Sequence, residues 1–186
     1  MDAEATLTRR SCYLSEQERS RQRSEPDRPD MPGYGIHSSG EGMLPWGHVD
    51  ERMAQARNYW VATTRPDGRP HCAPVWGVWV DGTFYFGTGP RSRKARNLSA
   101  NPNVVVHLES GDDVVILEGI AEEVADPGPS LFARIADAYA AKYVDPETGE
   151  KFRPSGAEGM YAVRPRVAFA WLERDFPRTA TRWSFG

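Results

Sequence analysis

The sequence contains little cysteine and no pattern of paired metal ligands. Two cysteines, Cys12 and Cys72, and four histidines occur in 186 residues. Cysteine this sparse excludes a disulfide-rich scaffold. His71 and Cys72 are neighbours, and neighbouring residues of a strand point to opposite faces, so they do not form a ligand pair. We therefore expect neither a structural disulfide nor a metal site.

Long apolar runs and a broad positive charge are also missing. No apolar run approaches the ~20 residues that a membrane-spanning helix needs, and the N-terminus lacks the apolar stretch of a signal peptide. The net charge of -3 argues against a general nucleic-acid binder, because binding to phosphate backbones needs a wide cationic surface. The sequence predicts a cytoplasmic protein with no membrane and no nucleic-acid partner.

The usual motifs of nucleotide and hydrolase sites are absent too. Gly87-Thr-Gly89 lacks the third glycine of a dinucleotide fingerprint, and neither a P-loop nor a G-x-S-x-G elbow occurs. The paired carboxylates at 112–113 and 122–123 are typical of solvated turns and strand ends, so no catalytic residue is assigned. A chain without reactive groups of its own suits an enzyme whose cofactor supplies the difficult step.

The first 42 residues differ in composition from the rest of the chain. They are rich in Arg, Glu, Asp, Ser, Pro and Gly and show no sustained apolar period, so we expect residues 1–42 to form a flexible tail. Met31 and Met43 are alternative starts besides Met1. Residues 43–186 carry the apolar pattern of one domain that is long enough to bury a core.

Residues 43–186 show the pattern of short strands with about three helices. Helices are expected at 45–56, 93–100 and 129–143, and strands at 58–64, 71–80, 83–86, 103–108, 114–124, 159–163 and 166–173. Residues 174–186 show no such pattern. Strands joined mostly by hairpins exclude a parallel sheet, so we predict a mainly β fold, an antiparallel barrel that closes its own edges. Pro74 has no N–H group, which predicts a sheet edge or a bulge there.

A basic segment follows the aromatic strand 83–86. Arg91, Arg93, Lys94 and Arg96 lie close together in an otherwise acidic chain, and Ser92 stands where a helix N-cap would stand. A helix N-terminus presents unpaired N–H groups, and cationic side chains around it favour a phosphate. The alternative interpretation is a solvated helix face. We predict a small-anion site.

Aromatic residues are frequent on the two strands that lead to this segment. They are Trp76, Trp79, Phe84, Tyr85 and Phe86. Core packing would explain each of them singly. Together, an apolar surface of planar rings beside a phosphate site is typical of a pocket of flavin size.

Five stretches of the chain together resemble one known family. They are residues 57–71, 74–79, 85–89, 92–98 and 179–183. In combination they are similar to the pyridoxamine 5'-phosphate oxidase-like split-barrel superfamily, and within it to the flavin/deazaflavin oxidoreductase branch. The resemblance covers the chain from residue 45 to the C-terminus. It implies an antiparallel split barrel of six to seven strands, a homodimer, and two cofactor sites at the subunit interface.

The resemblance also implies which residues bind the cofactor. The phosphate-binding stretch is matched by Arg91, Ser92 and Lys94, with Thr88 and Gly89 at the strand end before it. The strand beside the tricyclic ring is matched by Pro74, Val75 and Trp76. A C-terminal stretch that closes over the cofactor, that of the partner subunit, is matched by Arg182 and Trp183. The alternative for Trp183 and Phe185 is that they plug the open end of the barrel.

The predicted function is that of an oxidoreductase that binds the deazaflavin coenzyme F-420, or FMN, and transfers a hydride to a small conjugated organic acceptor. The longer anionic tail of the deazaflavin favours a basic groove, which Arg91, Arg93 and Arg96 would provide. One alternative is a non-catalytic protein that binds or stores a flavin or a haem-breakdown product. Another is a pyridoxamine 5'-phosphate oxidase, although the phosphate motif and the C-terminal Arg-containing segment of the oxidase proper are not found in this sequence.

Overall fold

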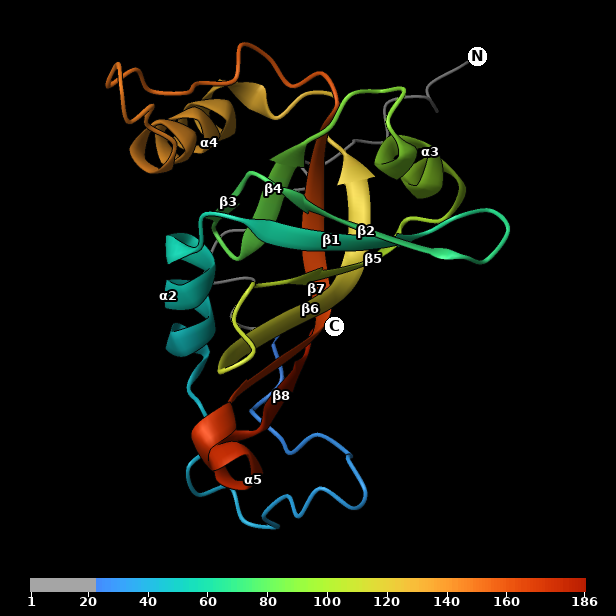
Figure 1. Ribbon diagram of the computed structural model, residues 1–186, viewed down its shortest axis with the longest axis vertical. Helices are drawn as coiled ribbons and strands as arrows, with labels where there is room; N and C mark the ends of the chain where they lie inside the picture. Colours follow the sequence, from blue (N-terminus) through green and yellow to red (C-terminus); the bar gives the residue numbers. More distant parts are fainter. Residues whose placement is uncertain (1–22) are drawn as a thin grey trace, which may run out of the picture.

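One antiparallel sheet lies at the centre of the computed structural model, which describes residues 23–186 (Figure 1). Its strands follow one another in the order β2-β1-β5-β6-β7-β4-β3, and β8 pairs with β7. All seven kinds of strand contact are antiparallel. The predicted class, a mainly β antiparallel split barrel, is confirmed. Residues 1–22 of the expected tail lie outside the described residues.

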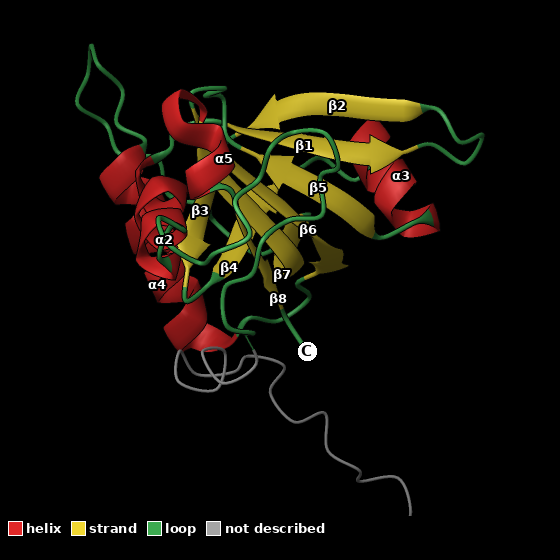
Figure 2. Cartoon of the chain, turned by 90° about the horizontal axis from the view of Figure 1, so that it is seen from below, coloured by secondary structure: helices red, strands yellow, loops and turns green. Residues whose placement is uncertain are grey.

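The strands and helices have the following bounds. The strands are β1 (Tyr59–Thr64), β2 (Pro70–Val75), β3 (Gly77–Val80), β4 (Thr83–Gly87), β5 (Asn103–His107), β6 (Asp113–Glu123), β7 (Met160–Leu172) and β8 (Thr181–Ser184). The helices are α2 (Trp46–Gln55), α3 (Arg93–Ala100), α4 (Gly128–Lys142), the 3-10 turn η1 (Glu173–Asp175) and α5 (Phe176–Thr179). Helices α2 and α4 flank one side of the sheet and α3 the other (Figures 1 and 2). Within residues 23–186, no helix is both long and apolar enough to cross a bilayer.

The expected strand 71–80 is divided at Trp76 into β2 and β3. Strand β2 pairs with β1 and β3 pairs with β4, and these pairs stand at opposite ends of the strand order. The chain through Trp76 therefore joins the two ends and closes the barrel. Pro74 lies in β2, at the end of the order, where no ladder hydrogen bond is lost. The residue after the bend is Gly77. Glycine is required at this position because a Cβ would collide with the ring of Phe84.

Strand β7 is continuous, although two strands had been expected in its place. The expectation was wrong because Pro165 lies at a bulge and not at a turn. The pairing of β6 with β7 shifts register between Glu118 and Gly119, and Gly119 faces Pro165. A Cβ on Gly119 would collide with the carbonyl oxygen of Arg164, so only glycine fits this crossing. The long strand therefore bends and continues, which lets β7 pair with β6, β4 and β8.

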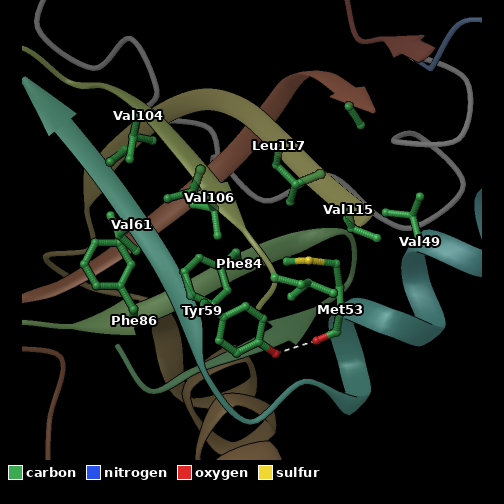
Figure 3. Close-up of a cluster of buried hydrophobic side chains, with 14 of the residues drawn as sticks. Val49, Met53, Tyr59, Val61, Phe84, Phe86, Val104, Val106, Val115 and Leu117 are labelled. Atoms are coloured by element: carbon green, nitrogen blue, oxygen red, sulfur yellow. Dashed lines mark hydrogen bonds between the residues drawn. The ribbon is translucent and has the colours of Figure 1, made fainter. Parts of the chain in front are cut away.

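Buried side chains of the core pack against both faces of β4. Its side chains Phe84 and Phe86 point into the barrel, where they meet Tyr59 of β1 and Met53 of α2 (Figure 3). Tyr85 points to the opposite face and packs with side chains of α4. All three aromatic residues of this strand are buried. Strand β4 is thus covered by the barrel interior on one side and by α4 on the other.

The C-terminal residues form regular structure, contrary to the expectation for 174–186. They build α5 and then β8, which pairs with the stretch Val167–Ala170 of β7. A strand of four residues is too short to show a period of its own. It forms because β7 offers an open row of main-chain N–H and C=O groups, a constraint that comes from tertiary structure.

Residues 23–42, here called the N-terminal strap, lie against this C-terminal segment. Asp27 and Arg182 exchange both main-chain hydrogen bonds, at 2.9 and 2.8 Å, and Arg23 forms a β-bridge with Phe185. The strap therefore continues the sheet beyond β8. This part of the expected tail is held mainly by main-chain hydrogen bonds, which any residue except proline can donate, so its composition gave no sign of the contact.

Arg28 holds the strap to the rest of the molecule. Its guanidinium group donates five hydrogen bonds of 2.7–2.9 Å to main-chain carbonyl oxygens. The acceptors are Ser39, Glu41, Arg178 and Ala180. The planar fork of arginine is suited to several acceptors at fixed angles, which a lysine cannot satisfy together.

We predict that Arg28→Ala lowers the free energy of unfolding by about 2 kcal/mol, because hydrogen bonds to a charged group are lost and their carbonyl acceptors lose partners. Arg69→Ala is the control, since Arg69 pairs with Asp67 on an exposed turn and such pairs contribute about 0–1 kcal/mol. Urea unfolding of both variants measures the difference. Equal effects of the two substitutions would show that Arg28 does not fasten the strap.

Candidate functional site

A pocket of about 560 Å³ opens where β2 and β4 end and β7 begins. Its volume lies within the usual range for small-molecule sites, roughly 300–1,000 Å³. The strand side of its wall is formed by Pro74, Val75, Gly87 and Met160. The other side is formed by Trp76, Tyr139 and the loop that leads to β7, with Phe152, Arg153, Pro154, Ser155, Gly156 and Glu158. Lys94 enters from the start of α3.

The structure brings four of the predicted site residues to this pocket. Pro74, Val75 and Trp76 line it from β2 and the bend, and Lys94 lines it from α3. Thr88, Gly89, Arg91, Ser92 and Arg93 form the connection from β4 and the first turn of α3, directly before Lys94. The two halves of the predicted site, which are separate in the sequence, therefore meet in the fold.

The first turn of α3 is organised around Ser92, and its predicted role as N-cap is confirmed. The hydroxyl oxygen of Ser92 accepts from the N–H of Ala95 at 3.0 Å and from the hydroxyl of Thr88 at 2.9 Å. Its own proton is therefore left to donate outward. Within the described chain, the N–H groups of Arg93 and Lys94 have no acceptor. Free N–H groups and a serine proton at a helix N-terminus are the donor set that a phosphate requires.

The ammonium group of Lys94 has no hydrogen-bond or ion-pair partner among residues 23–186. Burial lowers its pKa, since the pocket wall removes water from the charge. His71 lies close by: burial lowers its pKa, and the neighbouring charges of Lys94, Arg65 and Arg93 lower it further. This concentration of positive charge around a half-buried lysine favours an anionic ligand.

The remaining predicted residues, Arg182 and Trp183, lie on β8 and point to opposite faces of the sheet. Trp183 is 1% exposed and packs against Trp46 at a ring distance of 5.4 Å. Phe185 packs on the same ring at 5.3 Å. These two aromatics fill the barrel end, in the way that the packing alternative expects, and the structure does not bring Trp183 to the pocket.

Arg182 lies at the end of a row of residues on the outer face of the sheet. The register pairs them across six strands, and we call them the outer row: Pro74, Trp60, His107, Ile116, Phe169 and Arg182. Their neighbours along each strand, such as Val61 and Leu117, are buried in the barrel, so the outer row faces away from the core. It runs from the pocket, at Pro74, to Arg182 at the far edge.

A buried network behind Trp76 fixes one wall of the pocket. The Trp76 ring stacks on Tyr143, with ring centres 4.5 Å apart and an angle of 17° between the planes. The hydroxyl of Tyr143 accepts from the N–H of Gly77 at 2.8 Å and lies within donating distance of the carbonyl oxygens of Gly77 and Arg57. Lys142 donates to the hydroxyl of Tyr59 at 2.6 Å. The bend of the chain at Trp76 is therefore held from behind.

Sequence reasoning missed several of these residues. The sequence pattern placed Tyr139 on the apolar face of a helix, and it gave no reason to single out Tyr143, Lys142 or His71. A signal existed only for the loop, since residues 145–156 lie between two predicted elements and loops often complete pockets.

Together the strands and the pocket define a split-barrel protein with a pocket of about 560 Å³ beside the basic N-terminus of α3. Residues 46–172 match the family model described as pyridoxamine 5'-phosphate oxidase, and the chain belongs to this family. The resemblance to the pyridoxamine 5'-phosphate oxidase-like superfamily is thereby confirmed.

Individual relatives show the same relationship. The chain is 30% identical over 128 residues to the pyridoxine/pyridoxamine 5'-phosphate oxidase of Acidothermus cellulolyticus, covering 67% of this chain and 51% of that protein. The chain thus spans about half the length of this relative. The conserved hypothetical protein Rv2991 of Mycobacterium tuberculosis is similar with a TM-score of 0.55 and 25% identity, over 75% of this chain and 91% of that chain. A putative 5-nitroimidazole antibiotic resistance protein of Bacteroides thetaiotaomicron shares the fold at a TM-score of 0.51 and 16% identity, over 87% and 89% of the two chains.

We predict a pH dependence of stability that Lys142 causes. Burial lowers the pKa of Lys142 from 10.5 to about 8. Between these values the unfolded chain binds more protons than the folded chain, so stability increases with pH in this window. Relative to Lys142→Met, the unsubstituted protein should therefore gain stability from about pH 8 to about pH 10.5 and show no relative change below it. Thermal unfolding of both proteins from pH 7 to 11 measures this, and parallel curves would contradict it.

Proposed function

We propose that this protein is an oxidoreductase that binds the deazaflavin coenzyme F-420, or FMN in its place, and transfers a hydride to a small conjugated organic acceptor. The observation that carries the proposal is the partnerless, half-buried Lys94 at the meeting point of the pocket and the α3 N-terminus. Such a lysine next to free N–H groups fits the phosphate that both cofactors share. Membership of the pyridoxamine 5'-phosphate oxidase family supports a redox function in general.

Different residues of the proposed site would bind different parts of the cofactor. Lys94, Ser92 and the free N–H groups of α3 would hold the phosphate, and Pro74 and Val75 would lie along the tricyclic ring. The cofactor, when bound, supplies the hydride chemistry, which explains why the pocket needs no acid–base pair of its own. The protein contributes position, a dry apolar surface and the charge that neutralises the phosphate.

The positive charge beyond the phosphate site favours the deazaflavin over FMN. Arg91, Arg93 and Arg96 are exposed on and before α3, and Arg65 and His71 lie on the adjoining β1–β2 hairpin. An anionic oligoglutamate tail would find complementary charge there, whereas FMN has no group to occupy it. The absorption spectrum of the purified protein distinguishes the two, because free flavins absorb near ~450 nm and deazaflavins near ~420 nm, and the protein only orients this chemistry.

The outer row supports a homodimer as part of the proposal. Three of its four inner members, Trp60, Ile116 and Phe169, are apolar and partly exposed, and they form a cross-strand patch on the outer face of the sheet. A two-fold axis across the row would reverse its direction in the second copy. Arg182 of the partner subunit would then approach the Pro74 end, where the pocket lies. Only Arg182 has the outward orientation for this role.

A second candidate reaction is the oxidation of pyridoxamine 5'-phosphate. The 30% identity to the Acidothermus cellulolyticus oxidase favours it, and a phosphorylated substrate would also suit a cationic pocket. Incubating the FMN-loaded protein with pyridoxamine 5'-phosphate and following the absorbance of the aldehyde product tests this candidate. Turnover with this substrate would replace the main proposal, and turnover only with conjugated acceptors and reduced cofactor would support it.

We predict that Lys94→Ala weakens cofactor binding by roughly 1.5–3 kcal/mol, the cost of losing a charge-assisted hydrogen bond to an anion. Lys94→Arg should restore part of the affinity, because a planar fork replaces a point charge imperfectly. Titration with F-420 and with FMN, followed by absorbance, gives the dissociation constants. Arg174→Ala, an exposed cation on η1 outside the pocket, is the control. Equal affinity of Lys94→Ala and the unsubstituted protein would remove Lys94 from the phosphate site.

We predict that Phe169→Asp converts a dimer into monomers and weakens cofactor binding, because a carboxylate within the apolar part of the outer row cannot be buried against a second copy without cost. Val144→Asp, a charge placed on an exposed apolar residue outside the row, should change neither property. Sedimentation velocity and cofactor titration measure both effects. A cofactor-bound monomer of the unsubstituted protein would contradict the dimer model.

A further inference from the structure

One wall of the pocket is lined by aromatic residues that the phosphate site does not use. Among residues 23–186, the exposed large apolar side chains are Tyr34, Trp76, Val144 and Phe152. Trp76 and Phe152 are each 46% exposed, and both line the pocket. Large aromatic side chains on an accessible surface indicate a binding surface when they gather at a cavity.

The ring of Trp76 is held rigidly from one side. It stacks on the buried ring of Tyr143, whose hydroxyl contacts both main-chain polar groups of Gly77. Gly77, the residue after Trp76, is therefore hydrogen-bonded to Tyr143, whose ring stacks on Trp76. Trp76 needs no rearrangement to receive a ligand, which lowers the entropy cost of binding.

Trp76 lines the pocket and remains 46% exposed although its ring stacks on Tyr143. Arg57 lies near the stack, and its guanidinium carbon is 5.5 Å from the ring centres of both Trp76 and Tyr143. A group above the face of Trp76 that points away from Tyr143 would lie farther from Tyr143 than from Trp76. Equal distances place Arg57 beside the stack, so it does not cover that face.

Phe152 makes a second side of this subsite. Its ring lies 5.9 Å from that of Trp76 at an angle of 75°, and 5.6 Å from that of Tyr139 at 64°. The two accessible rings thus stand at a steep angle to each other. A flat ring that stacks on Trp76 would present its edge or face to Phe152, the two arrangements that aromatic pairs prefer.

The aromatic wall carries one cation, which is already paired, and one exposed carboxylate. Arg153 and Glu158 both line it, and Arg153 already pairs with Asp137 at 2.9 Å. The partnerless cation, Lys94, belongs to the phosphate side of the pocket. An anionic ligand would therefore find no unpaired cation on this wall. A charged group of either sign would lose its water against the two aromatic rings, whereas an uncharged ring would lose little there.

From these observations we infer that Trp76 and Phe152 form the acceptor subsite and that it takes an uncharged, flat, conjugated ring. The inference rests on the proposed function for the reduction itself, but binding of the ring depends only on the two aromatic side chains. It assigns Trp76 to the acceptor side of the cofactor ring, and it gives the loop at Phe152 the role of choosing the substrate.

The test uses two uncharged diketones of equal carbon number, duroquinone and camphorquinone. Duroquinone is flat, conjugated and fully substituted, so it does not add to the thiol of Cys72, and camphorquinone is a saturated cage. Both are titrated into the cofactor-free protein while tryptophan fluorescence is recorded. Duroquinone should quench saturably and bind several-fold more tightly than camphorquinone. Phe152→Leu should weaken duroquinone about three- to tenfold, the effect of one aromatic pair.

Matched variants separate stacking from a change in folding. Tyr34→Leu removes an exposed aromatic residue outside the pocket and should leave both affinities unchanged. Trp76→Leu should abolish the saturable quenching. Equal affinities for the two diketones, or an unchanged affinity of Phe152→Leu for duroquinone, would overturn the inference.

The same variants are titrated with F-420 and FMN. If the unsubstituted protein binds duroquinone selectively but neither cofactor, the proposed function fails and the aromatic subsite stands. If a cofactor binds but duroquinone shows no preference, the proposed function stands and the subsite fails.

Discussion

The hydrogen bonds between the Tyr143 hydroxyl and Gly77 are the contact on which barrel closure and the pocket both depend. Gly77 is the first residue of β3, and the preceding residue, Trp76, leaves β2. Because β2 and β3 stand at opposite ends of the strand order, the chain must bend sharply between them to close the barrel. The main-chain polar groups of Gly77 need partners at such a bend, and the hydroxyl of the buried tyrosine contacts both of them. The same bend turns the Trp76 ring outward. The bend that closes the barrel therefore also exposes the aromatic wall. Helix α4 ends directly before Tyr143, so it supports the barrel as well as the site.

The predictions from sequence succeeded where the cause is local. Ser92 caps α3 because its hydroxyl and the N–H of Ala95 are three residues apart. Pro74 lies in a strand that is paired on one side only, because its own nitrogen lacks a proton. They failed where the cause is a partner far away in the chain. Pro165 is accommodated only because Gly119 lies opposite it, and Asp27 is ordered only because Arg182 offers a sheet edge. The same contrast between local and distant causes applies to the site. The motif around Lys94 was readable, whereas Tyr139 and Phe152 enter the pocket through the packing of α4 and its following loop.

Arginine and lysine have different roles in this protein, and the difference follows from their chemistry. Arginine serves as a multiple donor in fixed directions, as Arg28 does for four carbonyl oxygens of the strap and of the segment before β8. Lysine is rare, and two of the three lysines adjoin the pocket walls, Lys94 on the phosphate side and Lys142 behind Trp76. Burial lowers the pKa of both, so each is held in the folded chain at a cost in free energy. For Lys142 the compensation is internal, through Tyr59 and Gly77. For Lys94 no internal compensation exists among the described residues, and the phosphate of the proposed cofactor would supply it.

Strand β8 shows why the proposed site needs a second chain. In four residues it alternates between the two faces of the sheet: Thr181 and Trp183 face the core, and Arg182 faces outward at the end of the outer row. Trp183 secures the strand by packing on Trp46, so the outward position of Arg182 is fixed by the core and not by its own contacts. Within one chain, however, Arg182 pairs with the middle of β7, while the pocket lies at the start of that strand, at Met160. Arg182 thus stands far along β7 from its own pocket, at one end of a row that begins at that pocket, and this is the placement that the proposed dimer requires. In the proposed dimer each chain would complete the other's site, and loss of the interface would remove a cationic wall from both.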